Sequence, residues 1–154
     1  MAQEKQAGKR PAGTPGAFSR WMQQKMNGRM NRKIRNGHGT FMGMDVLILN
    51  TVGRRSGQPR QSPLAWFADG ENARLLIGSG GGSRNPDWYT NMMAHPEQVS
   101  IELPGHEAEP VVPQQLEGAE RDEAWQRIAA AQPRIAKYQN KSERRYPVVR
   151  LSPR

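Results

Sequence analysis

Three arginines and a serine are crowded into one short stretch of this chain of 154 residues, between the apolar runs 46–49 and 64–67. The turn-forming and polar residues of the stretch are Gly53, Arg54, Arg55, Ser56, Gly57 and Arg60. A hairpin does not need three guanidinium groups to turn, and arginine presents forked N–H donors that match phosphate and carboxylate groups. The stretch therefore predicts a turn that binds an anion. The alternative is a solvated hairpin tip that is basic because the whole chain is basic.

A second candidate binding segment follows the apolar run 74–77 and is rich in glycine. Its residues of interest are Gly78, Ser79, Gly80, Gly81, Gly82, Arg84, Asn85, Pro86 and Trp88. The order predicts a strand, a loop and a helix, with Asn85 as the helix N-cap and Pro86 as the first helical residue. Glycines let a backbone approach a ligand closely, and a helix N-terminus presents free N–H groups. The pattern matches neither the P-loop nor the dinucleotide-binding fingerprint, so a plain flexible loop is the alternative.

The elements that must position these two segments are short strands and a few helices. Strands are expected at about 45–52, 60–68, 73–79, 97–103, 107–115 and 147–151, and helices at 17–33, 86–94, 118–131 and 134–140. Asp69-Gly70 and Pro104-Gly105 mark turns between strands, and Pro133 ends a helix. Short strands separated by turn residues favour a barrel or a sandwich.

The expected helix at 17–33 carries an apolar row, Phe18, Met22, Met26 and Met30, with Lys25 and Arg29 between the apolar positions. Apolar residues four apart lie on one side of a helix, which predicts a helix docked on the barrel. The alternative is a helix that touches an anionic membrane surface or the tail of a cofactor.

Composition limits the function classes. The length suits a single domain, with residues 1–16 expected to form a disordered basic arm and residues 17–154 the folded part. The net charge of +9 suits nucleic acid, anionic membranes or anionic ligands, but no motif that reads nucleic acid is present, so no nucleic-acid partner is expected. The chain has no cysteine, no apolar run long enough to span a bilayer and no signal-peptide core, so the expected location is cytoplasmic.

The remaining candidate chemistry is sparse. The three histidines lack the spacing of metal ligands, and no metal site is expected. No serine has a neighbouring His–Asp pattern, so a hydrolytic triad is not expected. A cofactor would then have to supply the chemistry, and the protein would bind and orient it.

The two binding segments and the late part of the chain resemble the deazaflavin-dependent nitroreductase family, whose members use coenzyme F420. The resembling residues are 51–60, Pro63-Leu64, Gly81-Gly82, Asn85-Pro86, Trp88-Tyr89, Asn91, His95-Pro96, Tyr138-Gln139 and 147–149, in matching order over about residues 17–152. The resemblance implies an α+β fold that is mainly β, a split β-barrel of the FMN-binding and pyridoxamine-phosphate-oxidase-like type with helices around it. It also implies hydride transfer from reduced F420 to electron-poor conjugated molecules such as enones, coumarin-like lactones, quinones or nitro compounds.

The resemblance assigns roles to individual residues. Tyr138 is the implied proton donor, and Ser79 is placed near the reacting edge of the deazaflavin. The implied cofactor-binding residues are Arg54, Arg55, Ser56, Gly57, Arg60, Ser62, Pro63, Gly78, Ser79, Gly80, Gly81, Arg84, Asn85 and Trp88. The chain departs from relatives at Gln132 and Ile135, where some carry tyrosines, and at Gly80, where a lysine occurs. The missing tyrosines weaken the implication that nitro compounds are reduced. The missing lysine removes one contact with the phosphate or tail of the cofactor, unless Arg84 supplies it.

Three alternatives stay open at the level of sequence. The first is an oxidoreductase that uses FMN on the same barrel. The second is a non-catalytic protein that carries the deazaflavin, and the third is a basic nucleic-acid-binding domain. The sequence also leaves open whether the chain is a monomer or a dimer.

Overall fold

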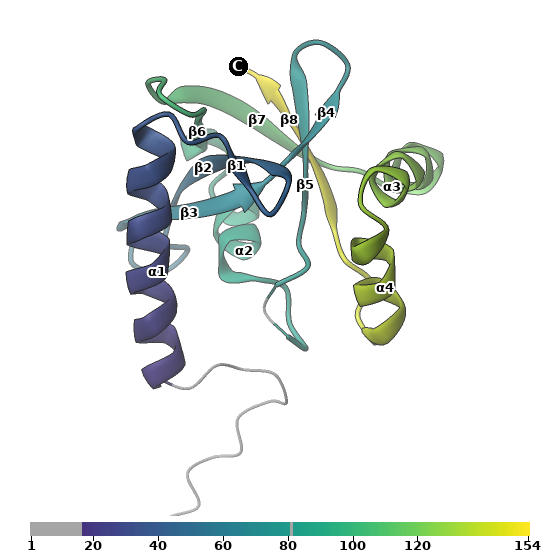
Figure 1. Cartoon of the computed structure of the whole chain (residues 1–154), viewed down its shortest axis with the longest axis horizontal. Helices are drawn as coiled ribbons and strands as arrows, with labels where there is room; N and C mark the ends of the chain where they lie inside the picture. The colour runs from purple at the N-terminus through teal and green to yellow at the C-terminus, as the bar shows by residue number, and fades with distance from the viewer. Residues whose placement is uncertain (1–16, 81) are drawn as a thin grey trace, which may run out of the picture.

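The computed structural model describes residues 17–80 and 82–154, so the expected basic arm at 1–16 and Gly81 lie outside the described residues. The helices are α1 (Ala17–Arg35), α2 (Asp87–Ala94), α3 (Gly118–Ala131) and α4 (Pro133–Lys141), with a 3-10 turn η1 (Pro96–Gln98). The strands are β1 (Thr40–Phe41), β2 (Met44–Val52), β3 (Pro59–Ala65), β4 (Phe67–Asp69), β5 (Ala73–Ile77), β6 (Ser100–Glu102), β7 (Glu109–Gln115) and β8 (Val148–Pro153). Figure 1 shows α1 on one side of the strands and α3 and α4 on the other.

The strands form a single antiparallel sheet that curls into a half-barrel. Its order runs β3-β2-β6-β7-β8-β5-β4, and β1 adds to the beginning of β2. The two end strands of this order, β3 and β4, are joined in the chain through the single residue Trp66. Because one residue cannot bridge a flat sheet of this width, the sheet must curl until its two ends meet. The expected α+β fold with a split barrel is confirmed.

Alternation along β2 shows how the sequence fills both faces of the sheet. Leu47 and Leu49 point into a cluster shared with β5, β6, β7, β8 and α2, while Val46 and Ile48 pack against Ile34 of α1. Successive side chains of a strand point to opposite faces, so a strand buried on both sides reads as a continuous apolar run. A third cluster, which includes Leu75, Val148 and Ile128, docks α3 on the outside of the barrel.

Helix α1 packs on β2 and β3, but not through the whole apolar row that the sequence singled out. Met22 is 44% exposed and Met26 is 64% exposed, and the side chain of Phe18 lies outside the described residues. Ile34 and the buried Asn31 meet the sheet instead, with Met30 packed at the edge of their cluster. The buried cluster that joins α1 to the sheet involves the last turns of the helix, while Gln24 and Asn27 of its earlier turns line a cavity.

The element boundaries follow the sequence closely, with four local differences. The expected strand at 60–68 is divided at Trp66 into β3 and β4, and β1 was not anticipated. The expected strand at 97–103 is reduced to β6, because residues 96–98 form the 3-10 turn η1. Helix α2 begins at Asp87, and Pro86 rather than Asn85 occupies its N-cap position, without a side-chain cap. The prediction of Asn85 as the N-cap was therefore wrong, because the amide oxygen of Asn85 accepts a hydrogen bond from Arg144 instead.

Candidate active site

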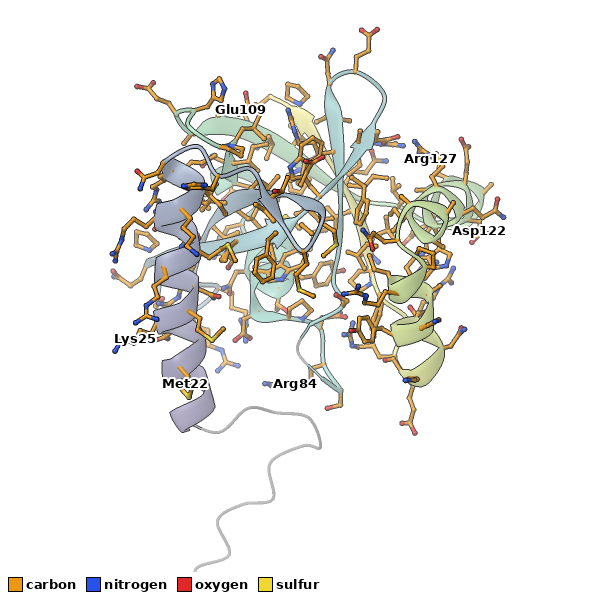
Figure 2. The ribbon with its side chains drawn as sticks, viewed as in Figure 1. Met22, Lys25, Arg84, Glu109, Asp122 and Arg127 are labelled. Atoms are coloured by element: carbon orange, nitrogen blue, oxygen red, sulfur yellow. The ribbon has the colours of Figure 1, made fainter. Side chains whose placement is uncertain are left out.

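A cavity of about 620 Å³ lies where the glycine-rich loop meets the barrel. Its walls come from α1, β3, β5, the start of α2 and α4, elements that are far apart in the sequence. Figure 2 shows Arg84, from the loop after β5, between α1 and that loop at the lower end of the molecule. The volume is within the usual range for pockets that hold cofactors or small ligands.

Eight of the residues to which the resemblance gives a catalytic or cofactor-binding role line this cavity: Ser62, Pro63, Ser79, Gly80, Arg84, Asn85, Trp88 and Tyr138. The apolar part of the lining includes Leu64, Leu76, Ile77 and Ile135. The lining therefore combines polar groups with apolar side chains. Gly81 cannot be placed because it lies outside the described residues.

The basic turn between β2 and β3 lies outside the cavity lining and is closed by its own backbone. The N–H of Gly53 donates to the carbonyl of Gln58 and the N–H of Gly57 donates to Gly53, both at 2.8 Å. The N–H of Gln58 donates to Oγ of Ser56 at 3.2 Å, so this hydroxyl supports the turn. Gly57 has φ +68, a conformation that favours glycine.

The three arginines of the turn have different environments. The guanidinium of Arg54 donates to Oδ1 of Asn91 at 2.9 Å and pairs with Asp87 at 3.4 Å, which fixes it on α2. Arg55 and Arg60 are exposed. Arg60 and Ser62 are two residues apart on β3, so their side chains leave the strand on the same face, and Ser62 lines the cavity. Arg60 thus leaves β3 on the same face as a residue of the cavity lining, whereas Arg54 serves the packing of the turn.

Tyr138 reaches the cavity from α4, one turn after Ile135. Its side chain is 53% exposed, so the phenol meets both the cavity and solvent. The neighbouring Gln139 holds the end of the helix in place, because its amide donates to the carbonyl of Arg144 at 2.8 Å and accepts the N–H of Tyr146 at 2.7 Å. Tyr138 and Ser79, which lie on distant parts of the chain, therefore border the same space.

Sequence reasoning missed Arg144 altogether. This side chain lies behind the glycine-rich loop and donates to Gly78, Gly80 and Asn85 at 2.8 to 3.0 Å. The contact joins segments about sixty residues apart, and no short motif or period connects them. Among the described residues, no group of three or more His, Asp or Glu is arranged to hold a metal ion.

The curled sheet, with a cavity beside the glycine-rich loop, places the protein in the split-barrel class. The chain belongs to the F420H(2)-dependent quinone reductase family, whose model matches residues 20–153. An F420H(2)-dependent quinone reductase of Mycobacterium tuberculosis is 32% identical over 124 residues, which cover 78% of this chain and 81% of the relative.

Solved structures agree with this placement. An F420-H2 dependent reductase matches with a TM-score of 0.60 and 31% identity, over 70% of this chain and 93% of that chain. A structure described as a domain-swapped dimer matches with a TM-score of 0.60 and 26% identity, over 88% of this chain and all of its own (100%). A heme storage protein of Vibrio cholerae, at 16% identity and a TM-score of 0.53, over 86% of this chain and 90% of its own, shares the fold alone.

The family identifies the activity and the cofactor. The protein is an F420-dependent oxidoreductase with quinone reductase activity, and its cofactor is coenzyme F420. This favours F420 over FMN, and an enzyme over a protein that only carries the deazaflavin. None of the described helices is long and apolar enough to cross a membrane.

Proposed function

We propose that the cavity beside the glycine-rich loop is the F420 site and that its open end receives the quinone. The observation that supports this most is that Ser79 of the loop and Tyr138 of α4 line one cavity. When bound, the reduced deazaflavin supplies the hydride. The chain's own residues then have to bind the cofactor, orient it and hold the substrate over it.

The donors around the cavity fit the parts of F420. The apolar side chains Leu64, Leu76 and Trp88 suit the face of a ring system, and Ser79 with the loop backbone suits its polar edge. Arg55 and Arg60 are assigned to the phosphate, because both are exposed in the turn that leads into β3, the strand whose Ser62 lines the cavity.

Asp87 is an acidic residue in the lining, and its charge would oppose a phosphate. Its pairing with Arg54 at 3.4 Å reduces this repulsion without using the two exposed arginines. The basic turn therefore has two functions in this assignment. Arg54 neutralises the wall, and Arg55 and Arg60 bind the anion.

Substrates beyond quinones are part of the proposal. Enones and coumarin-like lactones share with quinones a conjugated carbonyl whose oxygen gains negative charge as hydride arrives. A phenol at the position of Tyr138 can donate a hydrogen bond or a proton to that oxygen. Nitro compounds are placed last, because Gln132 and Ile135 occupy positions where some relatives carry tyrosines.

The site is tested by filling the cavity from the loop. A Cβ at Gly80 would meet only Pro86, at 3.9 Å, so the backbone accepts a side chain at this position. Gly80→Leu therefore places a bulky group in the lining and reduces the space for a ligand. We expect this variant to lose F420 binding, measured by titration of the cofactor's fluorescence. Gly28→Leu is the matched control, because Gly28 lies on α1 outside the lining and a Cβ there meets nothing within 4 Å.

The same titration with FMN, and turnover of menadione, enones and coumarin-like lactones, completes the experiment. F420 should bind more tightly than FMN, and the carbonyl compounds should be reduced with F420H2. A folded Gly80→Leu variant that binds F420 like the wild type would reject the cavity as the cofactor site.

A further inference from the structure

One guanidinium group holds most of the glycine-rich loop. Arg144 donates through Nη1 to the carbonyl of Gly78 and to Oδ1 of Asn85, each at 2.8 Å. Nη2 donates to the carbonyl of Gly80 at 3.0 Å, with a longer contact to Ser79 at 3.5 Å. Nε reaches the carbonyl of Gly82 at 3.4 Å. All three nitrogens of the side chain are thus directed at carbonyl groups of the loop or at the side chain of Asn85.

Arg144 is itself fixed by neighbouring residues of the α4 end. Its N–H donates to Oγ of Ser142 at 3.2 Å, and its carbonyl accepts from Ser142 at 3.0 Å and from Gln139 at 2.8 Å. The guanidinium lies over the ring of Tyr146, 5.0 Å from its centroid. A planar guanidinium that is stacked on a ring and anchored at its backbone has little freedom left to lose when it binds the loop.

The direction of these bonds determines what the loop offers on its other side. In a trans peptide the C=O of one residue and the N–H of the next point in opposite directions. The carbonyl of Gly78 points at Arg144 and that of Ser79 lies 3.5 Å from Nη2, so the N–H groups of Ser79 and Gly80, which follow these carbonyls, point away from the guanidinium. The cavity lining includes Ser79 and Gly80 but, among the described residues, not Arg144, so the loop lies between the guanidinium and the cavity.

We propose that Arg144 is a positioning residue for the F420 site: it binds the carbonyl side of the glycine-rich loop and so turns the loop's N–H groups toward the deazaflavin. The inference rests on the proposed cofactor cavity. The ligand chemistry is the carbonyl-bearing edge of the deazaflavin ring, which accepts hydrogen bonds from backbone N–H groups. Glycines make this arrangement sensitive, because without Arg144 the loop backbone has many accessible conformations.

The loop contacts need the forked side chain of arginine, and lysine cannot replace it. A lysine keeps the positive charge and an alkyl stem, but its single ammonium group cannot reach carbonyls that lie on both sides of the guanidinium fork. Arg145, the next residue, is the matched control. Its side chain is 68% exposed and pairs with Asp122 at 3.5 Å on the surface. Arg145→Ala removes the same charge from the same segment without touching the loop.

The experiment measures steady-state kinetics of Arg144→Lys, Arg144→Ala and Arg145→Ala with F420H2 and menadione. In both Arg144 variants we expect the KM for F420H2 to rise about tenfold or more, since several charge-assisted bonds that shape the loop are lost. The KM for menadione at saturating F420H2 should stay within about twofold, because the Tyr138 wall is held by Gln139 rather than by the guanidinium. Arg145→Ala should match the wild type in both constants.

Three results would overturn the proposal. The first is a folded Arg144→Lys or Arg144→Ala variant with an unchanged KM for F420H2. The second is a parallel rise of both KM values, which indicates general loosening of the cavity. The third is unfolding of Arg144→Lys, seen as a collapsed thermal midpoint, which makes the residue structural. If Gly80→Leu abolishes F420 binding while Arg144 variants behave like the wild type, only this inference fails. Retained F420 binding in Gly80→Leu rejects the cavity itself.

Discussion

Asn91 of α2 binds Arg54 of the basic turn twice. Its Oδ1 accepts the backbone N–H of Arg54 at 3.1 Å and the guanidinium of the same residue at 2.9 Å. Asn91 is 5% exposed, so water does not compete for these bonds. This one amide therefore fixes the turn between β2 and β3 against the helix that follows the glycine-rich loop. The two binding segments of the sequence are parts of a single assembly.

We expect Asn91→Ala to lower the free energy of unfolding by about 1–3 kcal/mol, since it leaves the N–H of Arg54 without its acceptor in a partly buried place. Chemical denaturation measures the loss. Gln98→Ala is the control, because Gln98 is exposed and its side chain contacts only the neighbouring Glu97 among the hydrogen bonds described. A loss no larger in Asn91→Ala than in Gln98→Ala would contradict the structural role of the amide.

Arg60→Ala should weaken F420 binding about 10- to 100-fold, because charge-assisted bonds to a phosphate each contribute about 1.5–3 kcal/mol. Arg60 is exposed, so the thermal midpoint should not change. Cofactor titration checks the affinity, with Arg145→Ala as a control for the loss of one positive charge. Arg55→Ala should act in the same direction. Wild-type affinity in both the Arg55 and Arg60 variants would remove the phosphate from this turn.

Most strands and helices could be predicted because each is a local pattern with turn-forming or helix-ending residues at its boundaries. The apolar run of β2, the Asp69-Gly70 turn and Pro133 all define boundaries within a residue or two of those observed. Several residues of the cavity, such as Ser79 and Tyr138, could also be predicted, because short segments of the sequence resemble a known family.

What could not be predicted depends on contacts between distant residues. Arg144 and Asn85 are 59 positions apart, and their bond both removes Asn85 from the helix cap and organises the loop. Met26 is 64% exposed because α1 packs on the sheet through Met30 and Ile34, a choice of face that the periodicity of the helix does not encode. In the basic turn, contacts with Asn91 and Asp87 of α2 separate the structural Arg54 from the exposed Arg60.

Acid should weaken the ion pair that joins the end of α1 to β6. The bidentate hydrogen bonds from Arg35, at 3.0 and 3.1 Å, lower the pKa of Glu102 more than its partial burial raises it, with help from Asn50. Because the folded pKa is lowered, this contribution to stability is complete above the unfolded value of about 4.3 and is lost as pH falls through the folded pKa.

Glu102→Gln should therefore lower stability at neutral pH and reduce its decline between about pH 5 and pH 3. Unfolding by denaturant at several pH values measures both effects. The exposed Glu123→Gln, which changes the net charge equally, serves as the control. An identical pH profile in Glu102→Gln and the wild type would show that the ion pair does not stabilise α1.

Tyr138→Phe tests the substrate side of the cavity. Hydride delivery to a conjugated carbonyl builds negative charge on its oxygen, and a phenol that donates to this oxygen stabilises that charge. Tyr138 lines the cavity and is 53% exposed, so loss of its hydroxyl leaves no buried polar group unpaired. We expect kcat for menadione and for enones to fall about tenfold or more, with F420 affinity and the thermal midpoint unchanged.

The control is Tyr89→Phe, which also removes a phenol hydroxyl, here one that donates to Gln115 outside the F420 cavity. It should leave kcat unchanged. The pH dependence of kcat separates a proton donor from a simple hydrogen-bond donor, because a proton donor adds a limb at alkaline pH that the Phe variant lacks. Wild-type rates in Tyr138→Phe across quinone, enone and lactone substrates would mean that solvent supplies the proton and that the tyrosine only closes the cavity.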